Sequence, residues 1–297
     1  MTSTDVAADV YLEHRGALFG LAYRMLGSVS DAEDVVSDAY LRWQGATADD
    51  ASIDDPKSYL FTITARLSID QLRSARRTRV DYIGTWLPEP LVTDWSSDPA
   101  IRAEVTDTLS LGLLRVLEVL SPVERAVFVL REAFDYPHDE TAQLLELSSA
   151  TVRQHYRRAR QRLSAERAPR FVAARDKQDE LMRRFLAAMQ TGEVQPLADL
   201  LASDAVLYAD GGGKASAIRQ PAHGHLRIAR FIRGLVRHSP RGTRVDLVGA
   251  NGDPAILVRT PTEVLGVYAF EVDPAHDVIR AVHAVRNPDK LSTLSVA

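Results

Sequence analysis

The stretch DETAQLLELSSATVRQHYRRARQRL, Asp139 to Leu163, decides the fold of the middle of this chain. Its pattern predicts a short helix, a turn at residues 147–149, and a second helix from residue 150 to about Leu163. Ala142 leaves room for the two helices to cross closely, and Val152 anchors the second helix to a core. This is the layout of a helix-turn-helix, whose second helix enters the major groove of DNA.

The second helix of this motif is strongly cationic. Five of its polar side chains are free to face base edges and phosphates: Arg153, Gln154, Arg157, Arg158 and Arg160. Glu146 stands at the turn position that glycine often holds in such motifs. Two ordinary packed helices with a basic face remain an alternative, so the motif by itself indicates only contact with DNA.

Charge is segregated along the chain although the net charge is only −4. Residues 31–55 hold eight acidic side chains and one arginine, whereas residues 56–80 hold six basic side chains and one aspartate. Residues 148–175 hold eight arginines and one glutamate. A single block of this kind can be a plain solvated helix face, but two basic blocks and one acidic block favour nucleic-acid and protein partners.

The first 80 residues predict amphipathic helices. Ser30 with Glu33 has the spacing of a capping box, which predicts that a helix begins there and continues through Trp43. Pro56, after two aspartates, marks the start of the next helix, which runs into the basic residues 73–79.

The rest of the chain divides in three. Residues 81–105 predict an extended linker, because two prolines lie in its Trp86–Pro90 segment. Residues 106–170 return to helix, with a second capping box at residues 121–124. Beyond residue 174, two amphipathic helices and five β-rich runs predict an α+β unit with an antiparallel sheet. The domains expected are therefore 1–80, 81–105 as linker, 106–170 and 176–297.

Composition bounds the protein class. The 297 residues suit about two domains, and 45% hydrophobic and 26% charged residues are ordinary for a globular protein. There is no cysteine, which excludes disulfides and thiolate metal sites. No metal and no cofactor is expected. No stretch of about 18 apolar residues occurs, so we expect a soluble, cytoplasmic protein with no membrane partner.

Three segments in order resemble bacterial sigma factors. Residues 20–44 resemble polymerase-binding region 2.2, residues 59–73 resemble the promoter-melting helix, and residues 141–163 resemble region 4.2. The resemblance implies the compact extracytoplasmic-function class, with core RNA polymerase and promoter DNA as partners and two all-α sigma domains. It implies a polymerase-binding face at Asp31, Asp34, Asp38, Arg42 and Trp43. It also implies contacts to the −10 element from Arg66, Asp70, Arg73, Arg76 and Arg77, with the −35 element read by the helix-turn-helix.

Three short motifs resemble those of the extracytoplasmic-function group with a fused SnoaL-like domain. They are the linker motif Trp86, Leu87, Pro88, Glu89 and Pro90; the loop Asp210, Gly211, Gly212, Gly213 and Lys214; and the tail Asn287, Pro288, Asp289, Lys290 and Leu291. The resemblance implies a cone-shaped, NTF2-like α+β domain that modulates activity in cis. We expect the linker motif to dock against the loop and tail, with Lys214 or Lys290 near Glu89. Simple turns remain the alternative for the loop and the tail.

Other functions stay open at this point. The SnoaL-like fold also builds enzymes, with Asp210, His223 and His225 as the candidates for proton transfer. The same cavity could hold an unidentified small ligand. A helix-turn-helix regulator with a ligand-sensing domain is the alternative function, although it assigns no function to the first domain. We expect no catalytic activity.

Overall fold

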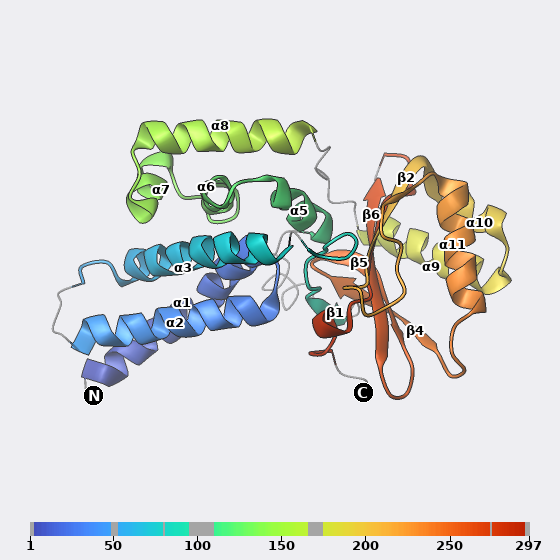
Figure 1. Ribbon diagram of the computed structural model, residues 1–297, viewed down its shortest axis with the longest axis horizontal. Helices are drawn as coiled ribbons and strands as arrows, with labels where there is room; N and C mark the ends of the chain where they lie inside the picture. The colour runs from blue at the N-terminus through green and yellow to red at the C-terminus, as the bar shows by residue number, and fades with distance from the viewer. Residues whose placement is uncertain are drawn as a thin grey trace. The chain divides into compact units, whose positions relative to one another are not determined.

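The computed structural model describes residues 3–48, 53–79, 81–94, 110–165, 175–273 and 275–294. These residues divide into two compact units, residues 1–80 with 116–168 and residues 81–115 with 169–297 (Figure 1). The segment expected as a linker thus belongs to the same unit as the C-terminal domain.

The first unit is helical. It contains α1 (Ser3–Leu26), α2 (Val29–Ala48), α3 (Pro56–Arg79), the short 3₁₀ helix η1 (Leu117–Val119), α6 (Pro122–Glu132), α7 (His138–Leu145) and α8 (Ser149–Ala165). Helices α1, α2 and α3 pack on one another, α6 packs on α7 and α8, and α3 also contacts α6 and α7.

Local capping explains where several of these helices begin. Ser121 and Glu124 form the predicted capping box at the start of α6, with each side chain bonded to the other residue's backbone. Asp55 caps α3, where it accepts a bond from the Ser58 N–H at 3.0 Å. The capping box predicted at Ser30 is wrong, because α2 already begins at Val29 and Ser28 accepts the bond from the Asp31 N–H.

The second unit is built on a seven-stranded sheet in the order β1-β4-β5-β6-β7-β2-β3. Its elements are β1 (Val92–Asp94), α5 (Leu111–Val116, whose last residue falls in the first unit), α9 (Arg175–Thr191), α10 (Val194–Ala198), β2 (Leu201–Asp210), β3 (Ala222–His223), α11 (His225–Arg237), β4 (Arg244–Ala250), β5 (Asp253–Arg259), β6 (Val264–Asp273), β7 (Val278–Val285) and η2 (Pro288–Lys290). The sheet is mixed rather than purely antiparallel, because β2 pairs with β7 in parallel. The α+β class is as expected.

Alternation along the strands gives the sheet two apolar faces. One face packs against α9, α10 and α11, and Phe185 of α9 meets Phe270 of β6 with ring centroids 4.9 Å apart. The opposite face packs against Leu87, Leu111 and Leu291. The segment 81–94, α5 and the tail therefore cover the face of the sheet opposite α9, α10 and α11.

Candidate functional site

Helix α8 presents a polar face and an apolar one. Val152, Ala159 and Leu163 are buried, and Val152 packs with Val127 of α6 and Ala142 of α7. The five side chains expected to face DNA are all exposed: Arg153, Gln154, Arg157, Arg158 and Arg160. Glu146 closes α7 in the left-handed conformation, with φ of 52°, which is the conformation that makes glycine common at this turn.

Helix α3 carries the residues expected at the −10 element. The Arg66 guanidinium is ion-paired with Glu146 at the end of α7. Asp70 and Arg73 are exposed and pair with each other at 3.0 Å. The side chains of Arg76 and Arg77 lie outside the described residues.

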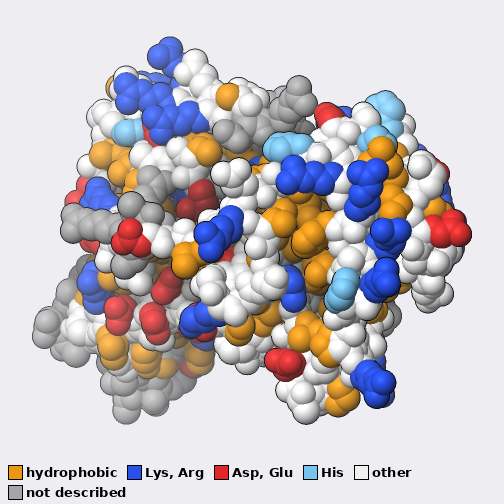
Figure 2. Space-filling model, turned by 45° about the vertical axis from the view of Figure 1, so that its right-hand side comes forward, with side chains coloured by type: hydrophobic (Ala, Val, Ile, Leu, Met, Phe, Trp, Pro, Cys, Tyr) orange, Lys and Arg blue, Asp and Glu red, His pale blue; other side chains and the backbone are white. Residues whose placement is uncertain are grey.

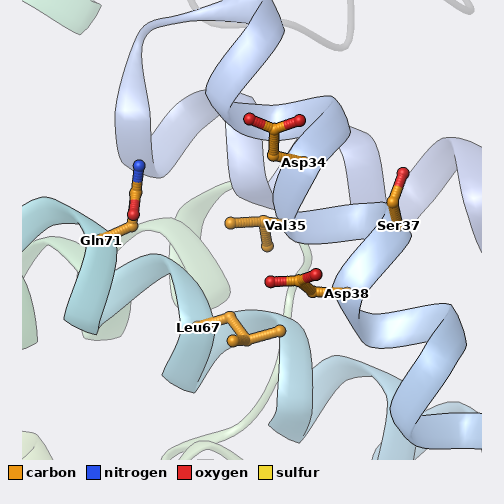
Figure 3. Close-up of a pocket in the computed structure, with 6 residues that line it drawn as sticks. All are labelled: Asp34, Val35, Ser37, Asp38, Leu67 and Gln71. Atoms are coloured by element: carbon orange, nitrogen blue, oxygen red, sulfur yellow. The ribbon is translucent and has the colours of Figure 1, made fainter.

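A groove lies between α2 and α3, and the acidic face of α2 forms one of its walls. Asp34, Val35, Ser37, Asp38, Leu67 and Gln71 line its volume of about 350 Å³ (Figure 3). Asp34, Asp38 and Arg42 are exposed, and Asp31 accepts a hydrogen bond from the Gln71 amide at 3.4 Å. The floor is apolar and the rim is acidic, which suits a partner with both apolar and basic groups.

Trp43 does not belong to this exposed face. Its side chain is 3% exposed, and its indole N–H donates to the Ala7 carbonyl at 2.7 Å. The expectation that Trp43 extends the docking surface is therefore wrong, because the indole completes the core between α1 and α2 instead.

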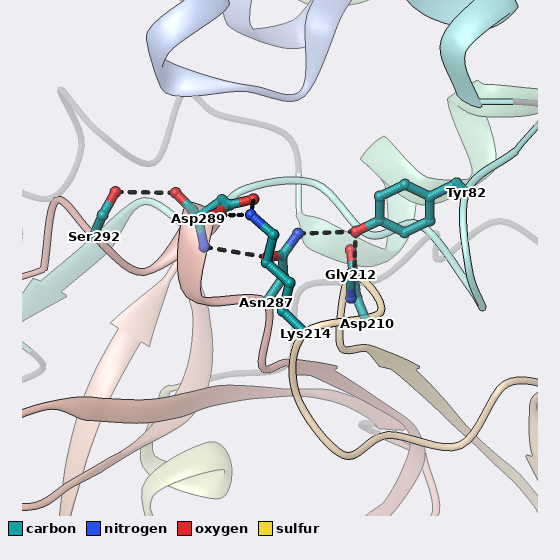
Figure 4. A network of polar contacts seen from close by, with 7 residues as sticks. All are labelled: Tyr82, Asp210, Gly212, Lys214, Asn287, Asp289 and Ser292. Atoms are coloured by element: carbon teal, nitrogen blue, oxygen red, sulfur yellow. Dashed lines mark hydrogen bonds and ion pairs between the residues drawn. The ribbon is translucent and has the colours of Figure 1, made fainter.

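Asp210, at the end of β2, is the centre of a buried polar network within the second unit (Figure 4). Its carboxylate is fully buried and accepts hydrogen bonds from the Tyr82 hydroxyl at 2.5 Å and the Leu87 N–H at 2.9 Å. Lys290 forms an ion pair with it at 2.7 Å, and the Gly212 N–H donates to it at 3.0 Å. Burial and the bond to Asp210 raise the pKa of Tyr82 well above its ordinary value.

The three short motifs meet around this carboxylate. Lys290 also donates to the Leu87 carbonyl, and its ammonium lies 4.1 Å from the centroid of the Trp86 ring. Lys214 pairs with Asp289 at 2.6 Å, and the Asn287 amide donates to the Tyr82 hydroxyl at 3.0 Å. The segment 81–94 is thus held against the loop and the tail through its backbone, its aromatic residues and the fully buried Leu87 side chain.

The loop and the tail together form the docking surface for the segment 81–94. Two of its features were not predicted from the sequence. Tyr82 lies four residues before the linker motif, and its aromatic ring was the available signal. Strand β1 extends the docked segment along the sheet, with Val92 opposite Ala250. A three-residue strand is too short to show a sequence pattern that would predict this edge pairing.

The C-terminal unit also holds a cavity of about 890 Å³ on the helix side of the sheet. Phe185, Phe231, Ile256 and Phe270 are among the side chains that line it. The three candidates for proton transfer are not in its lining. Asp210 serves the docking network, His223 is exposed on β3, and His225 begins α11.

A second titratable cluster lies on the opposite face of the sheet. The His283 ring bonds to the Glu271 carboxylate at 2.6 Å and stacks on Tyr208. Burial opposes ionisation of Glu271, but the bond to His283 and nearby positive charges prevail and lower its pKa. Burial, and then the charge of Glu271, raise the pKa of Asp253 well above its ordinary value. Sequence reasoning missed this cluster because its members lie on four separate strands.

Among the described residues, no helix is long and apolar enough to cross a membrane. In the same part of the chain, no three His, Asp or Glu side chains are grouped so that they could hold a metal ion.

The family models match both helical parts of the chain. Sigma-70 region 2 matches residues 10–78, and Sigma-70, region 4 matches residues 110–163. With the helix-turn-helix of α7 and α8 and the α2–α3 groove, these matches define a sigma-70-type transcription initiation factor. A helix-turn-helix regulator without polymerase binding is not favoured, because it does not account for region 2.

Similar proteins define more closely which kind of sigma factor this is. The chain is 38% identical over 238 residues to the ECF RNA polymerase sigma factor SigJ of Mycobacterium tuberculosis, covering 80% of this chain and 74% of the relative. It is 30% identical over 297 residues to the probable ECF sigma factor SigI of the same species, covering 99% and 98%. The crystal structure of M. tuberculosis SigJ matches with a TM-score of 0.74 at 31% identity, over 94% of this chain and 95% of that one.

The chain therefore belongs to the extracytoplasmic-function RNA polymerase sigma factors, and it recognises promoters. The crystal structure of SigJ, matched over 94% of this chain, agrees with the expected order of two helical sigma regions followed by an α+β domain. These relatives are sigma factors, which are not enzymes.

Proposed function

We propose that α8 reads the −35 element of the promoter. Its exposed arginines and Gln154 lie on the face opposite Val152 and Leu163, so they point away from the core that holds the helix in place. This exposed row of groups suited to bases and phosphates is the observation that carries the assignment.

The acidic groove between α2 and α3 is the proposed binding site for core RNA polymerase. Asp34 and Asp38 border an apolar floor that includes Val35 and Leu67. Asp31 and Arg42 extend the same face along α2. Trp43 supports this binding site indirectly, because it holds α2 against α1 and does not itself contact the polymerase. The same proposal predicts a cytoplasmic location, where RNA polymerase works.

The proposed −10 surface on α3 comprises Arg66, Asp70, Arg73, Arg76 and Arg77. Arg66 is engaged by Glu146, so this surface is partly occupied within the first unit. Other contacts also join regions 2 and 4: the Phe61 and Phe134 rings are 5.3 Å apart, and Arg125 donates to the Met25 carbonyl at 2.7 Å.

Regions 2 and 4 must separate for both promoter elements to be bound at once. Elements centred near −10 and −35 lie about 25 base pairs apart, which is roughly 85 Å along B-DNA. Two modules that contact each other directly, as these do, cannot span that distance. The compact first unit is therefore the closed form in our proposal, and holoenzyme formation opens it.

The C-terminal domain is proposed to regulate this opening in cis, by holding the segment between regions 2 and 4. Residues 81–94 are held at Asp210 and Lys290, so the connection available to the two sigma regions is shortened. Coupling of about 1–3 kcal/mol between docking and opening would change the active fraction roughly 5–150-fold.

Run-off transcription with purified core polymerase on a genomic template library tests the proposal. Wild-type protein should start transcripts at defined promoters. Asp34→Lys with Asp38→Lys should abolish holoenzyme formation while helical content is unchanged. Alanine at Arg153, Gln154, Arg157 and Arg158 should erase the −35 footprint while the polymerase is still bound. Normal polymerase binding by the first variant, or an unaltered footprint with the second, would refute the respective assignment.

A small apolar ligand in the cavity is a second candidate function of the C-terminal domain. The observation that favours it is the volume of about 890 Å³ with a largely aromatic and aliphatic lining. An increase in melting temperature with apolar compounds, which is lost when Phe231 is replaced by Arg, would support it. No catalytic activity is proposed for this cavity.

A further inference from the structure

The C-terminal domain contains a third basic block. From residue 211 to residue 245 the chain has eight Lys or Arg residues, three histidines and no aspartate or glutamate. Lys214 is paired with Asp289 in the docking network. Half of the eight lie on a single helix, α11.

Helix α11 has one apolar, buried face and one cationic, exposed face. Ile228, Ala229 and Ile232 are buried against the sheet. Arg227, Arg230, Arg233 and Arg237 are all exposed. Their spacings of three, three and four residues place them on one face of the helix. Figure 2 shows Lys and Arg side chains in a column on the side of the molecule that carries α11, with histidines nearby.

The side chains of these four arginines make no ion pair or hydrogen bond with any residue that the structure describes. The same domain pairs exposed arginines elsewhere: on α9, Arg183 pairs with Glu180 and Arg184 with Asp277. Like charges three or four residues apart destabilise a helix by about 0.2–0.5 kcal/mol per pair. The row therefore works against the stability of α11, and an anionic partner would compensate for it.

We propose that this arginine row, Arg227, Arg230, Arg233 and Arg237, binds the phosphate backbone of duplex DNA beside the promoter elements. Arginine binds phosphate through a planar, permanently charged fork. Ten residues of α-helix span about 15 Å. Duplex DNA presents one negative charge per about 1.7 Å of axis, so a partner of matching charge density faces the whole row. The inference rests on the proposed function, because promoter binding brings duplex DNA to the protein.

Such a surface adds affinity without sequence preference. Each phosphate contact adds about −0.9 to the slope of log affinity against log salt. Two arginines that both contact phosphates then account for about −1.8, which is roughly a 12-fold loss of affinity between 50 and 200 mM salt.

The test measures binding of the full chain to a labelled 40-base-pair duplex of arbitrary sequence, by fluorescence anisotropy between 50 and 200 mM KCl. Arg230→Gln with Arg233→Gln should weaken binding and make the salt slope shallower by about 1.8. The matched control is Arg183→Gln with Arg184→Gln, which removes the same charge from another exposed helix of the same domain. The control should leave the slope unchanged. The α11 variant should melt no lower than the wild type, because it removes like-charge repulsion within the row.

Equal slopes for the α11 variant and the wild type would overturn the inference. Loss of binding to core polymerase or to anionic vesicles, with DNA binding intact, would also overturn it and identify a different partner. Arg153→Gln with Arg157→Gln, read out by the −35 footprint, tests the proposed function separately. If the α8 variant loses the −35 footprint and the α11 variant binds DNA with the wild-type salt slope, α8 remains the −35 reader. The proposed DNA contact of the arginine row is then refuted.

Discussion

Replacing Asp210 with asparagine should release the docked segment while changing almost no volume. The carboxylate is fully buried and accepts bonds from Tyr82, Leu87 and Lys290. An amide of the same shape keeps one acceptor oxygen but carries no charge. The Lys290 ammonium, with a side chain only 12% exposed, then loses its counter-ion in the docked state.

The size of the effect follows from this burial. Removing one partner of a buried ion pair costs about 3–5 kcal/mol. At about 1.36 kcal/mol per tenfold change, the docking equilibrium falls by about two to nearly four orders of magnitude. Removing both charges with Asp210→Asn and Lys290→Met should recover much of this loss, because no buried charge then remains uncompensated.

Fluorescence of Trp86 reports the docking directly. With Trp43 and Trp95 replaced by phenylalanine, Trp86 is the remaining tryptophan, and its emission should shift to the red when the segment leaves Lys290. Asp210→Asn should show this shift, and the double variant should show less of it. Wild-type emission from Asp210→Asn, in a protein with normal circular dichroism, would refute the view that Asp210 holds the segment.

Three further predictions concern the two units. Gly212→Ala should destabilise the docking loop by about 1–3 kcal/mol in denaturant titrations, since Gly212 has φ of 59° and an added Cβ would lie 2.4 Å from Asn287 Cγ; an unchanged midpoint would contradict this. The raised pKa of Asp253 means that its contribution to stability is full below the ordinary value of 3.8 and is lost as pH rises through the raised pKa. Asp253→Asn should therefore raise the melting temperature more at pH 8 than at pH 4, and an equal shift at both would count against the explanation. Arg125→Met removes the donor to Met25 and leaves Glu118 without its buried partner, so the first unit should lose about 3–5 kcal/mol by urea titration; a loss below 1 kcal/mol would show that the contact is not a strong one.

Local signals in the sequence predicted helices well. The capping box at Ser121 and the proline at residue 56 act within one turn of helix, so they are visible without any tertiary information. Ser28 and Ser30 compete for the same role at α2 and differ by two residues. The choice between them depends on how α1 ends at Gly27, whose φ is 67°.

The errors came from interactions across long stretches of chain. The parallel pairing of β2 with β7 joins segments about 75 residues apart, and alternation within a strand does not specify its neighbour. Trp43 is a different case, because it lies at the helical spacing of the buried Val36 and Ala39, so the periodicity already indicated its burial and only the resemblance placed it on the exposed face.

The three docking motifs were singled out by their resemblance to those of the sigma-factor group with a fused SnoaL-like domain. Docking of the linker motif on the loop and the tail was expected, but the individual bonds were not. Asp210 bonds to residues 123 and 128 positions before it and to one 80 positions after it, and no local pattern specifies such pairs.

The order of synthesis has a consequence for when regulation begins. The contact between Lys290 and the Leu87 carbonyl joins residues 203 positions apart. A ribosome adding about 5–20 residues per second needs roughly 10–40 s to make that stretch. Regions 2 and 4 are complete well before the tail exists, so under the proposed regulation each new chain passes through an interval in which its promoter-binding parts are present and the restraint is not. The proposed regulator is part of the same chain, so its ratio to the sigma regions is one to one and gene expression cannot change it.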